Sequence, residues 1–193
     1  MPLSKPAKRK HLHSRNYSFA GYEREDGLFD IEGHMTDTKS YSFDSTFRGH
    51  VAAGEPIHDM WIRMTINDSL EVIDVEAKTV SGPHAICPAI NDQYKAIIGT
   101  RLVAGWNHQV RKAVSGVHGC THLTDMLRNM GTVAYQTMWP TLNRKANEKR
   151  AANPDKERSR PLLLNTCHAY ASDSEIVERD WPEYYTGDTA KAD

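Results

Sequence analysis

Two cysteines stand where helices are predicted to begin, in the segments Cys87-Pro88 and Gly119-Cys120-Thr121-His122. The first backbone N–H groups of a helix have no partner within the helix, and the helix dipole favours negative charge there. Both effects lower the pKa of a cysteine, and the thiolate is the form that binds metal or attacks an electrophile. The two thiols therefore indicate a metal site or a nucleophile. The alternative is that each cysteine is only a small buried hydrophobe.

Histidines and an aspartate accompany these cysteines. His58 and Asp59 stand at the head of an alternating apolar strand, and two further histidines flank Cys120. A mixed set of cysteine, histidine and aspartate suits Zn²⁺ or a mononuclear iron, although no Cys-x-x-Cys pair is present. The candidate metal ligands are His58 or Asp59, Cys87, Cys120, and either His118 or His122.

Several other side chains are weaker candidates. Cys167 and His168 form a third pair, which either completes the metal site or only packs there. Asp37 and Lys39 share one face of a predicted strand and could supply a general acid or base, the alternative being a surface ion pair. Arg24 could bind a substrate carboxylate through its planar guanidinium group.

Composition narrows the possible partners. The 193 residues carry a net charge of −1, and no basic stripe or stacking motif indicates a nucleic-acid partner. No apolar run is long enough to span a bilayer, and no secretory signal precedes the first element, so we expect a cytoplasmic protein without a membrane partner. Three cysteines are an odd number, and a reducing compartment would leave them free.

The elements that must position these residues are two hairpins followed by helices. Period-two alternation predicts strands over residues 16–24, 28–38, 59–66 and 70–80. Helical spacing predicts a helix that begins at Cys87, a short helix over 106–114, and a helix from Cys120 to about Trp139. Strands first and helices second indicate an α+β fold, with antiparallel hairpins forming a sheet and the helices packed on one face.

The length fits one domain. We expect a flexible basic tail over residues 1–14, a single α+β domain over 15–182, and a polar tail over 183–193. Within the domain, the charged, apolar-poor segment 143–160 is predicted to be a solvated helix extension or a linker.

Five short segments together resemble a bacterial domain-of-unknown-function family, number 2889, over nearly the whole chain. They are Tyr22-Glu23-Arg24-Glu25-Asp26-Gly27, Asp37-Thr38-Lys39, Gly119-Cys120-Thr121-His122-Leu123, Asn165-Thr166-Cys167-His168 and Trp181-Pro182. That resemblance implies no settled activity.

The central part, residues 58–139, is also similar to NifU/IscU-type scaffold proteins of iron–sulfur cluster assembly, which have a β-hairpin and two helices that each begin with a cysteine. The resemblance places Asp59 at a family aspartate and matches Cys87 and Cys120 to the second and third family cysteines. No cysteine precedes Asp59, so His58 would have to replace the first one. Gly119 stands where the family often has a histidine.

Three functions follow from these observations. The first is a metal-binding protein, with zinc or iron, that either only binds the ion or uses it as an enzyme on a small organic substrate. The second is a carrier of sulfur or of an iron–sulfur cluster that serves a partner protein, against which the missing first cysteine counts. The third is a non-catalytic accessory subunit in which the cysteines are core residues.

Overall fold

The computed structural model describes residues 2–152 and 160–187. The chain divides into two compact units, residues 1–145 and 146–193, and each unit is described by itself. The predicted segments 143–160 and 183–193 therefore fall partly outside the described residues.

The first unit is built on a four-stranded antiparallel sheet in the order β1-β2-β5-β6. The strands are β1 (His13–Glu23), β2 (Phe29–Lys39), β5 (Pro56–Ile66) and β6 (Val72–Ser81). Each antiparallel hairpin joins strands that are adjacent in the sheet, and the β2–β5 pairing joins the two hairpins. The predicted antiparallel α+β architecture is thus confirmed.

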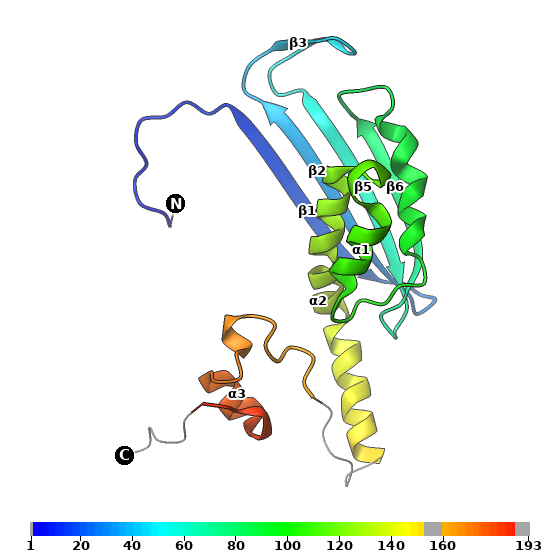
Figure 1. Cartoon of the computed structure of the whole chain (residues 1–193), viewed down its shortest axis with the longest axis vertical. Helices are drawn as coiled ribbons and strands as arrows, with labels where there is room; N and C mark the ends of the chain where they lie inside the picture. Colours follow the sequence, from blue (N-terminus) through cyan, green and yellow to red (C-terminus); the bar gives the residue numbers. More distant parts are fainter. Residues whose placement is uncertain (1, 153–159, 188–193) are drawn as a thin grey trace. The chain divides into compact units, whose positions relative to one another are not determined.

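Helices follow the strands and cover one face of the sheet, as Figure 1 shows for α1 and α2. They are η1 (Cys87–Ile97), α1 (Trp106–Val114), η2 (Gly116–His118) and α2 (Thr121–Ala152). A separate small hairpin, β3 (Phe43–Ser45) and β4 (Gly49–Val51), lies between the two long hairpins in sequence.

The core lies between this face of the sheet and the helices. In β2, buried residues alternate strictly with partly exposed ones, as expected for a strand with one covered face. Two glycines let α2 approach closely, because a Cβ at Gly21 would lie 1.8 Å from Thr137 Oγ1 and one at Gly33 would lie 3.3 Å from Met130 Sδ. Glycine at these two positions therefore allows α2 to pack closely against the sheet.

Three predicted boundaries differ from the structure. Strand β1 begins at His13, three residues before the predicted start. The helix that begins at Cys87 is a 3-10 helix, whose N-cap is Ile86. Helix α2 continues through Pro140 to Ala152, because the segment after the proline is rich in alanine, lysine and arginine, which favour helix.

The second unit contains η3 (His168–Tyr170), α3 (Glu175–Asp180) and η4 (Pro182–Tyr184). The Ser174 hydroxyl caps α3 by accepting a hydrogen bond from Val177 N–H. Across both units, none of the described helices combines the length and the apolar character needed to cross a membrane.

Candidate functional site

Three charged or titratable residues form a row across the helix-covered face. Arg15 of β1 pairs with Asp37 of β2, and Asp37 pairs with His58 of β5. Asp37 continues the buried positions of β2, so it stands at the end of the apolar row that begins at Phe29. The sheet register therefore brings together residues that are 21 and 22 positions apart in sequence.

Asp37 is the centre of this cluster. Its side chain is 3% exposed. Arg15 Nε donates to Oδ1 and Arg15 Nη2 donates to Oδ2, both at 2.7 Å. The ring of His13 lies 3.0 Å from Oδ1 through Nε2, and the ring of His58 lies 2.9 Å from Oδ2 through Nδ1. The carboxylate thus accepts hydrogen bonds from both sides.

Charge explains the ionisation of Asp37. Burial alone would raise the pKa of this carboxyl group, but the hydrogen bonds and charge of Arg15, followed by those of His58, lower it to about 2. Asp37 is therefore an anion throughout the ordinary pH range. The prediction of a surface ion pair with Lys39 is wrong, since Asp37 is buried and pairs with Arg15, whereas Lys39 Nζ lies over the rings of Tyr41 and Phe43.

The start of α2 adds a second imidazole. His122 Nε2 lies 3.8 Å from Asp37 Oδ2, and the ring centroids of His122 and His58 are 4.0 Å apart. The turn before α2 is held tightly, because the buried hydroxyl of Tyr94 accepts a hydrogen bond from Cys120 N–H at 2.8 Å. A Cβ at Gly119 would lie 1.9 Å from the carbonyl oxygen of Val114, so only glycine fits there.

Burial favours the neutral form of both imidazoles. Burial is the largest cause that lowers the pKa of His58, and it outweighs the hydrogen bond to Asp37. Burial also lowers the pKa of His122, with help from the nearby His58 and Arg15. A neutral imidazole keeps one nitrogen lone pair free, and that lone pair is what a metal ion or a proton requires.

Three of these residues can contribute ligand atoms to one ion. Asp37, His58 and His122 each offer one atom, and the three atoms all lie within 4.8 Å of one another. Among the described histidines, cysteines, aspartates and glutamates, this is the one such group of three or more. It combines residues that the sequence analysis assigned to separate candidates, namely Asp37 as an acid or base and the two histidines as ligands.

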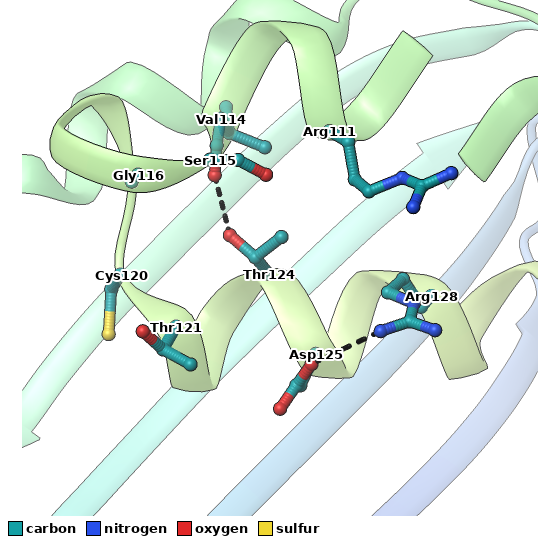
Figure 2. Close-up of a pocket in the computed structure, with 10 residues that line it drawn as sticks. Arg111, Val114, Ser115, Gly116, Cys120, Thr121, Thr124, Asp125 and Arg128 are labelled. Carbon is teal, nitrogen blue, oxygen red and sulfur yellow. Dashed lines mark hydrogen bonds and ion pairs between the residues drawn. The ribbon is translucent and has the colours of Figure 1, made fainter. Parts of the chain in front are cut away.

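Cys120 lies on the other side of the His122 ring. Its Sγ is 3.8 Å from His122 Nδ1 and 3.8 Å from Met60 Sδ, whereas His122 turns Nε2 toward Asp37. Cys120 is half-buried beside a pocket of about 170 Å³ between the end of α1 and the start of α2. Figure 2 shows Cys120 at one end of this pocket and Arg111 and Arg128 at the other.

Three other residues that the sequence indicated as metal ligands lie away from Asp37. Asp59 is on the opposite, polar face of the sheet, where its Oδ1 lies 2.9 Å from His34 Nε2. Cys87 lies against Gly82, since a Cβ on that glycine would be 3.3 Å from the cysteine Sγ. His118 ends η2 and is exposed. None of the three belongs to the group around Asp37.

The remaining candidates belong to the hairpin end and to the second unit. Arg24 forms ion pairs with Asp26 and Asp30 at the end of the first hairpin. Cys167 is an exposed free cysteine, and His168 begins η3. Both lie in the second unit.

Sequence reasoning missed Arg15 and His13. Both precede the predicted first strand, and His13 was assigned to the tail. A signal was present, because His13 and Arg15 continue the alternation of Tyr17, Phe19 and Gly21 on one face of the strand. Extending that strand by three residues would have brought Arg15 opposite Asp37.

One family model matches this chain. The model described as Protein of unknown function (DUF2889) matches residues 13–136. The matched range contains every residue of the cluster described above, from His13 to His122. No curated protein and no solved structure matches the chain, and the similarity to NifU/IscU-type scaffolds stays a prediction.

Proposed function

The chain belongs to the DUF2889 family, and we propose that it binds one divalent transition-metal ion, zinc or ferrous iron, between His58 and His122 beside Asp37. The observation that carries the proposal is the convergence of three ligand atoms within 4.8 Å. Two neutral imidazoles and a carboxylate are donors that both ions accept. They come from β5, α2 and β2, so folding alone assembles the group.

Within this site, Asp37 suits the role of a supporting carboxylate. Its two oxygens already accept hydrogen bonds from Arg15, and its Oδ2 also accepts one from His58 Nδ1. Histidines that bind metals commonly donate their second ring N–H to a carboxylate, which fixes the ring and its tautomer. The His58 Nδ1–Asp37 bond leaves His58 Nε2 as the free donor to an ion.

Such a site would keep coordination positions open. Structural zinc is held by four protein ligands, whereas catalytic zinc has three and leaves a position for water or substrate. Two histidines would leave even more positions open than three ligands do, so a bound ion could polarise a carbonyl or lower the pKa of a bound water. The pocket beside Cys120 is lined by Arg111 and by Arg128, which pairs there with Asp125 at 3.6 Å, but the three proposed ligand residues do not line it.

The arrangement of the cysteines gives less support to a scaffold for iron–sulfur clusters. Clusters of this kind are held mainly by several thiolates. Among the described histidines, cysteines, aspartates and glutamates, no group of three converging ligand atoms includes a cysteine. A carrier that passes a cluster to a partner protein is therefore less well supported than the metal-binding protein. If the titration below finds no metal binding, the remaining alternative is an accessory subunit without metal.

The test is a titration of the metal-free chain with Zn²⁺, followed by calorimetry, and with Fe²⁺ under anaerobic conditions. We expect one ion per chain and a loss of affinity of at least about tenfold in His58→Gln and in His122→Gln. Glutamine at position 58 keeps an N–H donor toward Asp37 but has no imidazole lone pair.

The matched control is His34→Gln, because His34 also contacts an aspartate across the same two strands but lies on the polar face. Circular dichroism would check that all three variants fold. Equal zinc affinity in the His34, His58 and His122 variants would overturn the proposal.

A further inference from the structure

A second set of donors lies directly behind His122. Cys120 Sγ is 3.8 Å from Met60 Sδ and 3.8 Å from His122 Nδ1. Met60 is a buried residue of β5, and the other two residues stand at the start of α2. The Cys120 thiol therefore lies next to both a thioether and an imidazole.

Their spacing is that of atoms bound to a single ion. A metal–sulfur bond is about 2.3 Å long, so two sulfurs on one ion, at angles between tetrahedral and trigonal, lie about 3.8 to 4.0 Å apart. The slightly shorter metal–nitrogen bond of about 2.0 Å brings a sulfur and a nitrogen about 3.5 to 3.7 Å apart. Both distances from Cys120 Sγ are close to these values, so the thiol is already placed to share an ion with either neighbour.

The chemistry of the three donors selects the ion. Thiolate and thioether are soft ligands, and among the biological metals they favour Cu(I). A thioether is a poor ligand for zinc and for the oxygen-preferring cations. We propose that Cys120, Met60 and His122 form a binding site for one Cu(I) ion, which replaces the thiol proton of Cys120 and releases it to solvent.

The environment of the donors supports entry of an ion. Met60 is 1% exposed, but Cys120 is half-buried and lines the pocket between α1 and α2. The backbone of Cys120 is fixed by Tyr94, which holds the thiol in place without using the sulfur. The half-buried Cys120 is therefore the more accessible of the two sulfur residues for an entering ion.

This proposal does not depend on the divalent site, although the two share His122. The divalent site uses the side of the ring that faces Asp37 and His58, and the copper site uses Nδ1, which faces Cys120. Variants can therefore separate them. His58→Gln removes only the divalent site, Met60→Leu removes only the copper site, and His122→Gln weakens both.

The experiment is a competition for Cu(I) between the full chain and a coloured Cu(I) chelator, under reducing and anaerobic conditions. We expect one Cu(I) per chain and an affinity that falls at least tenfold in Met60→Leu and further in Cys120→Ser. Leucine has nearly the volume of methionine, so Met60→Leu preserves the fold. Met64→Leu is the matched control, since Met64 is four residues further along the same strand, on the same face, and is also fully buried.

Copper K-edge X-ray absorption adds a direct readout. We expect two sulfur neighbours of copper in the unmodified chain and one in Met60→Leu. Equal Cu(I) affinity in Met60→Leu and Met64→Leu would overturn the proposal, as would copper binding that survives Cys120→Ser and disappears in a Cys87→Ser, Cys167→Ser variant. If His58→Gln loses zinc binding but keeps Cu(I) binding, the copper site is independent of the divalent site, as proposed.

Discussion

Strands β2 and β5 carry two histidine–aspartate pairs on opposite faces of one sheet. On the helix-covered face, Asp37 of β2 contacts His58 of β5 at 2.9 Å. On the polar face the order is reversed, and His34 of β2 contacts Asp59 of β5, also at 2.9 Å. Residue types, strands and distances are the same, so the difference between the pairs comes from their neighbours.

The neighbours of the two pairs differ in charge and in burial. Asp37 is 3% exposed and also binds Arg15, with the ring of His122 close by. Asp59 is 24% exposed, and His34 stacks on Trp61 with ring centroids 3.8 Å apart. A histidine–aspartate pair becomes a candidate site where a helix start adds a further donor and excludes water, and it remains an ordinary surface contact where neither occurs.

The largest difference between the pairs should be in stability. We expect Asp37→Ala to lower the free energy of unfolding by about 3 kcal/mol, because it leaves Arg15 and His58 without their buried partner. Asp59→Ala should cost less than about 1 kcal/mol, as is usual for partly exposed ion pairs. Denaturant unfolding measures both, and similar losses in the two variants would remove the distinction between the faces.

The next largest effect should come from the close packing of α2 on one face of the sheet, which the other face lacks. Gly21→Ala should cost about 1 to 3 kcal/mol, since the new Cβ would clash with Thr137. Ser18→Ala, on the polar face of the same strand, is the control and should be nearly neutral. Adding Thr137→Ala should recover part of the loss, and a double-mutant cycle would show whether the two positions are coupled.

A smaller effect is expected in the pH dependence of stability. Burial lowers the pKa of both His58 and His122 in the folded chain, so the unfolded chain binds more protons just below the usual histidine pKa of about 6.5. The contribution is complete above that pKa and is lost as the pH falls through and below it. We expect thermal unfolding between pH 7.5 and 5.5 to show this decline.

The histidine variants test the assignment of that decline. His58→Gln and His122→Gln should each flatten the profile. A decline that keeps its full size in both variants would show that these two histidines do not cause it.

The smallest effect belongs to the stacked rings on the polar face. The His34–Trp61 stack should contribute about 0.5 to 1.5 kcal/mol in a double-mutant cycle. We also expect His34→Ala and Trp61→Ala to leave zinc and copper affinities unchanged. Metal affinity that falls in either variant would mean that the polar face contributes to the site.

Local patterns in the sequence predicted most of the elements. Strict alternation identified β2 and β5, and helical spacing gave the bounds of α1 and the start of α2. The end of α2 was harder to predict, because Pro140 normally interrupts a helix. An ordinary helix was expected to begin at Cys87, and the structure has a 3-10 helix there, with Ile86 at its N-cap position.

The site was less accessible to sequence reasoning, because it depends on pairing between distant strands. Asp37, His58 and His122 were each singled out, but nothing local indicates that Asp37 stands opposite His58. The cysteine pattern emphasised Cys87 and Cys120, whose helix starts look alike, although Cys120 contacts Met60 and His122 while Cys87 lies against Gly82. Met60 was seen only as an apolar residue of the strand.

The consecutive placement of His58 and Asp59 has a consequence for how the hairpins find each other during folding. A slip of one residue between β5 and β2 would turn every side chain of β5 to the other face. A slip in one direction would place Asp59 opposite Asp37, so that two carboxylates would meet. A slip in the other direction would place His58 opposite Thr36, where Asp59 now stands, so that a histidine would replace the aspartate beside His34. Either slip separates Asp37 from His58 and His34 from Asp59, and the two pairs therefore favour the observed alignment of the strands.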